Sequence, residues 1–228
     1  MLSFSRRVRY ITLSILFITH FSCAKTKDVE PIANIVNPVD TTNNDLDTIY
    51  LTENIPGFIL NEVLYDPPSG IAGDANNDGF RDPNEDEFVE FVNLSDSCIN
   101  LSGCKIFDTE NFNDSTSPAN HQFPDNTFLS SGKSLIVFGG GTPNGVFGNS
   151  LVFVSSNSVM NLNNSGDVMT LTDSLDNIIL TFDVEPLSNN PNESYTRFPD
   201  LTGYFVQHAT AFSGVLFSPG TRIDGSSF

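Results

Sequence analysis

The chain of 228 residues predicts an all-β sandwich, and two observations carry this prediction. Short runs of apolar and β-branched residues recur along the chain, separated by segments rich in Gly, Pro, Asn and Asp, which is the pattern of strands and turns. No segment keeps a long helical period. With 39% hydrophobic residues and 20 Phe, the chain can fill one sizeable core.

The expected strands begin at residue 58 and end at residue 207. A bend at Ser102 and Gly103 interrupts one of them, and the polar segment 173–177 joins two others in a hairpin. Asp47–Thr52 fits either a short strand or part of a tether, and Ser158–Leu162 fits a short helical turn. The expected strands are Phe58–Leu64, Phe88–Leu94, Ile99–Phe107, Ser134–Phe138, Leu151–Val154, Val168–Thr172, Ile178–Phe182, Ser194–Phe198 and Tyr204–Gln207.

Residues 1–22 have the features of a signal segment. Three arginines give a positive start, and the apolar run Ile11–Ile18 is too short to span a membrane. Cys23 follows in the sequence HFSC, which resembles a bacterial lipobox. We therefore expect cleavage before Cys23 and lipidation, including palmitate, of its sulfur and new amino group. The alternative is an ordinary secretory signal with an incidental cysteine.

The segment 23–56 is expected to be a mostly disordered tether, because its apolar residues are scattered without a sustained period. At coil dimensions of ~5–6 Å times the square root of its length, it holds the domain some tens of Å from a bilayer. Residues 57–228 are then the folded domain.

One acidic loop carries the best-defined chemistry in the sequence. Residues 74–85 read DANNDGFRDPNE, which fits the calcium-loop pattern D-x-[DN]-x-[DN]-G-x5-E without a gap. Gly79 allows the sharp turn, and Ca²⁺ takes six to eight oxygen ligands, which this spacing supplies from one segment. The alternative is a solvated acidic turn. The expected ligands are Asp74, Asn76, Asp78, the backbone carbonyl of Phe80, Asp82 and Glu85.

The surroundings of this loop differ from those of an EF-hand. Pro67, Pro68 and Gly70 argue against a preceding helix, and the residues after the loop alternate as in a strand. We therefore expect a structural calcium clamp between two strands, since a calcium sensor needs a pair of helices that can open. Arg81 is an unusual residue for the middle of such a loop.

Eight segments occur along the chain in the order typical of one domain family. They are Asn61–Pro67, Glu87–Asp96, Ile99–Gly103, His121–Pro124, Ser131–Gly139, Asn163–Asp173, Ser194–Asp200 and Phe217–Thr221. Together they resemble the lamin tail domain, a sandwich found in nuclear lamins and in many secreted bacterial proteins. The resemblance covers about residues 57–225 and implies an immunoglobulin-like fold that often serves as an accessory module beside surface enzymes.

One position departs from the family pattern. After Leu101-Ser102-Gly103 the family usually has an aromatic residue, often Trp, and this chain has Cys104. Cys98 and Cys104 flank the bend, so a disulfide between them is one reading, provided that their Cβ atoms lie within about 4.5 Å. The other reading is that Cys104 is a small core residue.

The remaining residues do not assemble a catalytic site in sequence. His121 and His208 are the histidines left after cleavage, and a lone histidine in a β domain is more often structural. No G-x-S-x-G elbow is present, and Gly139–Gly141 lacks the G-K-[ST] of a phosphate loop. Glu87 and Glu90 could imitate a glycosidase pair, but we expect them to face solvent or to support the acidic loop.

The net charge of the chain limits the kinds of partner that we expect it to bind. The formal net charge is −18, and removal of the three arginines with the signal segment lowers it to −21. Such a surface repels phosphate backbones, so we expect no nucleic-acid partner.

These observations predict a protein lipid-anchored to a bacterial outer membrane, periplasmic or surface-exposed. Its domain would be a non-catalytic interaction or adhesion module with structural Ca²⁺, and its partner an envelope protein or a glycan. The alternative is a calcium-dependent carbohydrate-binding module, with Tyr65, Tyr195 and Tyr204 as sugar platforms. A hydrolase is the third reading, and fold does not decide among the three.

Overall fold

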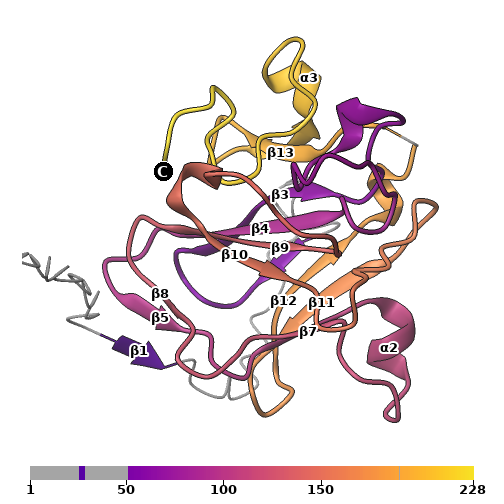
Figure 1. Cartoon of the computed structure of the whole chain (residues 1–228). Coiled ribbons are helices and arrows are strands. Elements are labelled where there is room, and N and C mark those ends of the chain that lie inside the picture. Colours follow the sequence, from indigo (N-terminus) through magenta and orange to yellow (C-terminus); the bar gives the residue numbers. More distant parts are fainter. Residues whose placement is uncertain (1–25, 29–50, 190) are drawn as a thin grey trace, which may run out of the picture.

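A computed structural model describes residues 26–28, 51–189 and 191–228 (Figure 1). The signal segment, Cys23 and most of the expected tether lie outside these residues. Strands dominate the described chain, and helices are restricted to short turns. The elements are β1 (Thr26–Asp28), β2 (Leu51–Glu53), β3 (Phe58–Leu64), η1 (Ile71–Gly73), β4 (Phe88–Asn93), β5 (Cys98–Asn100), β6 (Lys105–Phe107), α2 (Thr109–Asn113), β7 (His121–Gln122), β8 (Phe128–Leu129), β9 (Ser134–Phe138), η2 (Phe147–Asn149), β10 (Leu151–Val154), β11 (Val168–Thr172), β12 (Ile178–Asp183), η3 (Glu185–Leu187), β13 (Tyr195–Phe198), β14 (Tyr204–Gln207) and α3 (His208–Ala211).

The larger sheet has six strands in the order β10-β9-β4-β3-β13-β14. Its neighbours pair antiparallel except β9 and β10, which run parallel with Leu135 opposite Leu151. The second sheet has five strands in the order β2-β12-β11-β6-β7, and β1, β5 and β8 form a third, small sheet. Figure 1 shows β3, β4, β9 and β10 in one layer and β11 and β12 in a second layer beside it.

The main core lies between the two large sheets. Alternate residues of a strand face opposite sides of its sheet, so Val89 and Phe91 of β4 enter this core together with Leu171 and Phe182 from the second sheet. Cys104 is also part of it. Burial of each large apolar side chain contributes roughly 1.5–3 kcal/mol, and this burial holds the layers together.

A second, smaller core covers the other face of the six-stranded sheet. Phe88 and Phe138 meet there edge to face at 5.7 Å, with Ile136 beside them. Phe147 and Phe217, which come from segments outside the sheet, pack against this cluster. The six-stranded sheet is therefore buried on both faces, which explains why every residue of β4 is buried.

A bulge in β3 sets which side chains reach which core. The pairing of β3 with β4 shifts register between Leu60 and Glu62, so that Phe58 and Leu60 face the main core, and Val63 faces it again after the shift. Glu62 consequently points to the opposite face of the sheet, directly across from Glu90.

The prediction of an all-β sandwich is confirmed. The predicted segment Ile99–Phe107 is split into β5 and β6 by the turn at Gly103, which has φ of +75°. Ser158–Leu162 forms no helix, so the prediction of a helical turn there was wrong. A short helix that the sequence pattern did not predict is α2. Asp108 begins α2 by accepting a hydrogen bond from the Asn111 N–H at 2.7 Å.

The folded region begins before residue 57. β2 pairs antiparallel with β12, with Thr52 opposite Thr181. It overlaps Asp47–Thr52, for which the sequence left both a short strand and part of the tether open. A strand of three residues is too short to show an alternation in sequence, so only the pairing reveals it.

Candidate functional site

The acidic loop folds around its own carboxylates. The Asp74 carboxylate accepts hydrogen bonds from the N–H groups of Asp78 at 3.1 Å and Gly79 at 2.9 Å, and Asn76 Oδ1 accepts a second bond from Asp78 N–H at 3.0 Å. Gly79 has φ of +97°, a conformation that favours glycine. Asp82 Oδ1 accepts from the N–H groups of Asn84 and Glu85. These bonds fix the side chains at the first, third and ninth positions of the calcium pattern against the backbone of the loop.

Asp86 fastens the two ends of this loop together, a role that sequence reasoning missed. It is fully buried, and its carboxylate accepts hydrogen bonds from the N–H groups of Ala75 at 2.8 Å, Asn76 at 3.1 Å and Asp82 at 2.8 Å. Burial raises its pKa, and these three bonds oppose that shift. Asp86 directly follows the twelfth loop position, outside the pattern, so no spacing rule points to it.

The glycine run after β9 forms the wall against which the loop packs. A Cβ on Gly139 would lie 1.9 Å from the Asn84 carbonyl oxygen, and a Cβ on Gly140 would lie 2.8 Å from Cγ of Glu85. Gly141 has φ of +73°, and the position of its missing Cβ lies 2.3 Å from Asn76 Nδ2, 2.7 Å from Asp78 Oδ2 and 3.3 Å from Glu85 Oε2. The third, fifth and twelfth loop positions therefore converge on one point.

The electrostatics of the loop agree with this convergence. Loss of solvation, followed by the charges of Asp82, Asp78 and Asp86, raises the pKa of Glu85. A hard cation with oxygen ligands would relieve this repulsion, so the chemistry of the donor set fits calcium. In residues 26–28, 51–189 and 191–228 as they stand, no three His, Cys, Asp or Glu side chains are gathered closely enough to hold a metal. A bound cation would therefore draw the carboxylates closer together. The Asn76 amide oxygen and the Phe80 backbone carbonyl would complete its set of ligands.

The side chains of Phe80 and Arg81 point away from the carboxylates of the loop. Phe80 is 78% exposed, so only its backbone is available to the loop interior. Arg81 turns to the preceding segment, where its Nε donates to the Pro68 carbonyl at 2.9 Å and its Nη2 to the Pro67 carbonyl at 2.5 Å. The guanidinium is thus bonded to the backbone that precedes the loop.

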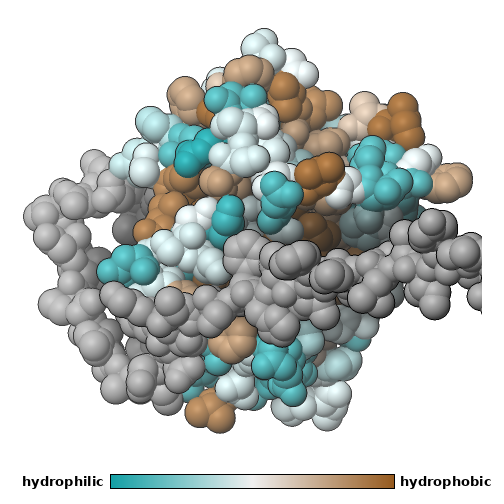
Figure 2. All heavy atoms as spheres, turned by 60° about the vertical axis from the view of Figure 1, so that its left-hand side comes forward, coloured by the Kyte–Doolittle hydropathy of each residue, from teal (hydrophilic) through white to brown (hydrophobic). Residues whose placement is uncertain are grey.

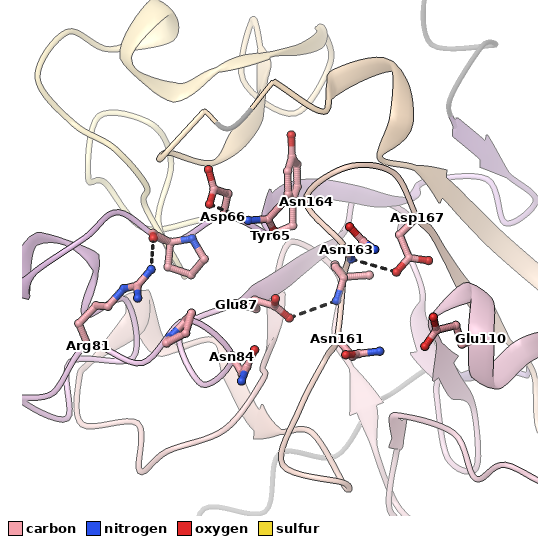
Figure 3. Close-up of a pocket in the computed structure, with 13 residues that line it drawn as sticks. Tyr65, Asp66, Arg81, Asn84, Glu87, Glu110, Asn161, Asn163, Asn164 and Asp167 are labelled. Carbon is pink, nitrogen blue, oxygen red and sulfur yellow. Dashed lines mark hydrogen bonds between the residues drawn. The ribbon is translucent and has the colours of Figure 1, made fainter.

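The outer flank of the acidic loop borders a cavity of about 450 Å³ (Figure 3). The other walls come from the residues that follow β3, from α2 and from the segment 161–167. Glu87 reaches into this space and is 4% exposed, and its Oε2 accepts a hydrogen bond from Leu162 N–H at 3.3 Å. Burial raises the pKa of Glu87 to about 8.

A second group of carboxylates is hidden on the other face of the same sheet. Glu62 and Glu90 are 0% exposed and lie opposite each other on β3 and β4. Glu62 accepts hydrogen bonds from the Ser194 hydroxyl at 2.7 Å and from the N–H and hydroxyl of Ser218 at 2.8 and 2.7 Å. Glu90 accepts from Asn61 Nδ2 at 2.9 Å and from Gly220 N–H at 2.6 Å. The pair therefore anchors the C-terminal segment to the sheet.

Burial dominates the acid–base behaviour of this pair. It raises the pKa of Glu62, with the charge of His208 acting in the opposite direction. Burial and then the neighbouring Glu62 carboxyl raise the pKa of Glu90 well above its usual value. The expectation that Glu87 and Glu90 face solvent was therefore wrong for both, because the six-stranded sheet is covered on both faces.

His208, Ser218 and Glu62 contact one another without the order of a hydrolase triad. His208 Nε2 lies 2.9 Å from the Ser218 hydroxyl, but its Nδ1 faces the Val215 carbonyl at 3.0 Å, and the carboxylate binds the serine. A triad places the carboxylate on the histidine. All three side chains are buried, so the arrangement is structural.

His121 is also a core residue. It packs edge to face on Phe123 at 4.6 Å between ring centroids, and burial lowers its pKa to about 4. The structural reading of both histidines agrees with these contacts.

The cysteines do not pair across the bend. Cys104 is a free, buried thiol, and Cys98 is disulfide-bonded, so the disulfide between them that the sequence left open is not formed. The physical reason is that Cys98 begins β5 in the small sheet, whereas Cys104 follows the turn and points into the main core. Cys104 therefore fills the position that an aromatic residue has in the family.

The tyrosines offer little surface for stacking a sugar. Tyr65 is 1% exposed, and its hydroxyl donates to the Leu187 carbonyl at 2.6 Å. Tyr195 is 6% exposed and stacks on Tyr65, and only Tyr204 is largely exposed. Platforms at Tyr65 and Tyr195 are excluded, because both rings are core residues.

Residues 52–185 match the family model of the Lamin Tail Domain, which covers more than half of the chain. The chain therefore belongs to the lamin tail domain family. The family consists of immunoglobulin-like domains that are typically non-enzymatic. A search of curated proteins found no match to this chain.

The match includes the acidic loop and the residues of β3 and β4. It ends before Ser194, His208 and Ser218, so the C-terminal half of the buried Glu62–Glu90 network lies outside it. The anchoring role of Glu62 and Glu90 was missed by sequence reasoning, because the donors of Ser194, Ser218 and Gly220 come from distant parts of the chain.

Proposed function

We propose that this protein is a non-catalytic interaction module, held at a bacterial cell envelope by lipid on Cys23, in which Ca²⁺ stiffens one end of the sandwich. The observation that carries the calcium proposal is the convergence of Asn76, Asp78 and Glu85 on the backbone of Gly141. A cation bound there would tie the connection between β3 and β4 to the end of β9, because ligands and wall come from those two regions.

Thermal melting in EDTA and in calcium tests this clamp. If the dissociation constant lies in the 10⁻⁴–10⁻³ M range of extracellular modules, 10 mM calcium stabilises the fold by about 1.4–2.7 kcal/mol. We expect the melting temperature to rise in calcium and the rise to disappear in Asp74→Ala/Asp78→Ala. The double variant Asp96→Ala/Asp125→Ala removes the same charge from exposed positions outside the loop and should keep the response. An equal rise in both double variants, or none in the parent protein, would show that the loop is only an acidic turn.

The lipid anchor is tested by metabolic labelling with palmitate. We expect label in the parent protein and none in Cys23→Ala, with the mature chain beginning at residue 23. Among the described residues, no helix is long and apolar enough to span a membrane. If the lipid on Cys23 holds the protein at the membrane, membrane fractionation should lose the Cys23→Ala protein to the soluble fraction.

Mass spectrometry gives a second test of the lipid anchor. A sulfur in a lipid thioether cannot also belong to a disulfide. Analysis after denaturing alkylation should therefore find lipid on Cys23, and a disulfide-linked peptide that contains Cys23 would contradict the anchor.

The net charge and the distribution of hydrophobic residues on the surface support the class of partner that we propose. The net charge of −18 disfavours nucleic acid, and an envelope protein or a glycan remains the proposed partner. On the face drawn in Figure 2, hydrophobic residues stand in separate groups among hydrophilic ones. Such a surface suits a weak or polar recognition mode better than a large apolar interface.

A further inference from the structure

A second cavity, of about 500 Å³, lies on the outer face of the five-stranded sheet. Ile106 of β6 points into the main core, so its neighbours Lys105 and Phe107 point to the opposite face of the sheet. Gln122 of β7 lies directly across from Lys105 and shares that face. Lys105, Phe107 and Gln122 all line the cavity and form its floor.

Two segments from other parts of the chain form the walls of this cavity. The first is α2 with the residues that follow it, and α2 packs on β6 and β11 (Figure 1). Asp114 fixes the backbone after α2, because its carboxylate accepts hydrogen bonds from Thr116 N–H at 3.0 Å and from the Ser117 hydroxyl at 2.9 Å. The second is the turn between β11 and β12, which contributes Asp176.

The cavity contains an exposed aromatic surface. Phe112 of α2 is 39% exposed, and its ring meets the half-buried Phe107 ring edge to face at 5.7 Å between centroids. This contact holds the Phe112 ring in place while part of the ring stays open. The aromatic surface that Tyr65 and Tyr195 cannot offer is therefore present at a different place in the domain.

Polar groups with unused hydrogen-bonding capacity surround these rings. Among the described residues, the Gln122 side-chain amide has no hydrogen-bond partner. Asn111 Nδ2 donates to Asn120 Oδ1 at 3.1 Å, so Asn111 Oδ1 can still accept. Lys105 Nζ donates to Asp176 Oδ1 at 2.6 Å, and this ion pair keeps two ammonium hydrogens and the second carboxylate oxygen for other bonds.

We infer that this cavity binds a neutral sugar, as a monosaccharide or as the end of a glycan chain. A pyranose ring has an apolar face of C–H groups, which would lie on the Phe112 ring, and hydroxyl groups at its edge, which both donate and accept. The Gln122 amide and the Asn111 acceptor suit these hydroxyl groups. The Lys105–Asp176 pair places a charged donor next to a charged acceptor, which suits two neighbouring hydroxyl groups. A volume of about 500 Å³ lies within the range of small-molecule sites.

Ligands of other classes fit the cavity less well. An anion would meet the carboxylates of Asp114 and Asp176, and a cation would meet the Lys105 ammonium. An apolar peptide would cover the Gln122 amide without offering it a hydrogen-bond partner, which costs free energy. A neutral ligand that carries several hydroxyl groups is therefore the class that satisfies both the exposed ring and the polar groups.

Titration calorimetry with a panel of sugars tests the inference on the full mature protein. The neutral probes are glucose, galactose, mannose, N-acetylglucosamine, maltose and cellobiose, and glucuronate is the anionic probe. We expect saturable binding of at least one neutral sugar, and weaker binding of glucuronate than of glucose. Gln122→Ala should weaken the affinity about fivefold, because one hydrogen bond is lost. Its control is Asn113→Ala, an exposed amide of α2 that does not line the cavity and should leave binding unchanged.

Phe112 allows a comparison between two exposed aromatic residues. Phe112→Ala removes the stacking surface and should weaken binding about tenfold or more, whereas Phe112→Tyr keeps the ring and should bind as the parent does. Phe128→Ala is the matched control, because Phe128 is 37% exposed and lies on β8 outside the cavity. Thermal melts of each variant separate lost binding from lost folding.

Asp176→Asn tests the ion pair through specificity. The substitution leaves the Lys105 ammonium without its anionic partner, and asparagine tolerates the φ of +66° at this position. Glucuronate should then bind the variant about fivefold more tightly than it binds the parent, because its carboxylate can pair with the ammonium. An unchanged preference between glucuronate and glucose would contradict this role of the pair.

The inference rests on the proposed interaction role, since it names a glycan as the partner, but not on calcium, because no expected calcium ligand is among the described residues that line the cavity. All titrations and melts are made in EDTA and in calcium, which separates the two proposals. Sugar binding in both conditions without a calcium-dependent melting shift would support the cavity and refute the clamp. A calcium-dependent shift without saturable binding of any probe up to ~10 mM would overturn the cavity and leave the clamp in place. Equal binding by the parent, Phe112→Ala and Gln122→Ala would also overturn it, because the sugar would then bind elsewhere.

Discussion

The acidic loop and the Glu62–Glu90 pair are two ways of concentrating carboxylates on one sheet. In the loop, the acids are neighbours in sequence and reach the surface. They accept hydrogen bonds from N–H groups of the loop itself. In the pair, two acids from different strands are sealed from solvent and bonded to residues more than 100 positions away. The loop is suited to a cation, whereas the pair is suited to holding the C-terminal segment.

The difference shows how burial decides the role of a carboxylate. Acids that reach the surface are open to a hard cation, which can neutralise them. Fully buried acids have raised pKa values and serve as acceptors for the donors that close over them. The comparison predicts that substitutions in the pair change stability, and that substitutions in the loop change the response to calcium.

The largest effect is expected from Glu62→Ala. It leaves the Ser194 hydroxyl and the N–H and hydroxyl of Ser218 without their acceptor in a buried site, which should lower the free energy of unfolding by about 3 kcal/mol or more. Urea denaturation measures this loss. Glu62→Gln keeps an acceptor of the same shape and should lose less. If Glu62→Ala were no more damaging than Glu185→Ala, an exposed change, the anchoring role of the pair would be wrong.

Gly141→Ala should have the next largest effect and should act on the loop. The added Cβ meets Asn76 and Asp78, and φ of +73° adds backbone strain, so a loss of about 1–3 kcal/mol is expected together with a weaker calcium response. Gly132→Ala is the matched control, because Gly132 has φ of +69° with open space at its Cβ position. Melting curves of both variants in EDTA and calcium make the test, and an equal calcium response in the two would remove Gly141 from the site.

The pH dependence of stability distinguishes the pair from the loop. The pKa of Glu90 is higher in the folded protein than its usual value of about 4.5, so the contribution of the neutral acid is fully present below pH 4.5 and is lost as the pH rises through the folded-state pKa. Glu90→Gln should therefore show a flatter fall of the unfolding free energy with rising pH. The difference can reach about 1.4 kcal/mol per pH unit for one proton. Identical slopes for the two proteins above pH 4.5 would contradict the raised pKa.

The smallest effect is expected from Asp78→Asn in EDTA. The amide retains an oxygen that can accept from the N–H of Phe80 or Thr142, and removal of one negative charge relieves repulsion in the loop, so stability should change by less than about 0.5 kcal/mol. The same variant should shift the calcium midpoint of the melting response to higher concentration. A large loss of stability in EDTA would mean that Asp78 holds the loop together without metal.

The strands of the sandwich could be predicted because their signal is local. The segments Phe58–Leu64, Ser134–Phe138 and Val168–Thr172 have the predicted bounds, since apolar runs between turn residues identify a strand without knowledge of its neighbours. The acidic loop was recognisable for the same reason, as its ligand positions are consecutive. β7 was missed, and the sequence left open whether the segment of β2 is a strand or part of the tether, because strands of two or three residues are defined by their partners.

The role of the glycine run illustrates what lay beyond the sequence pattern. Gly139–Gly141 reads as the end of a strand, but in the structure it lets the acidic loop approach within contact of the backbone. The need for three residues without Cβ atoms is set by Asn84 for Gly139, by Glu85 for Gly140 and by Asn76 and Asp78 for Gly141, all more than 50 residues earlier in the chain. No local rule connects these segments.

The sequence by itself determined the all-β class, the positions of the long strands, membership of the lamin tail domain family and the acidic loop, because each depends on residues close together in the chain. Tertiary structure alone decided that Glu62, Glu87 and Glu90 are buried, that Cys104 is a free core thiol, and that Asp86 and Gly141 complete the loop. The physical reason is burial: whether a charged side chain faces water depends on which distant segment covers it.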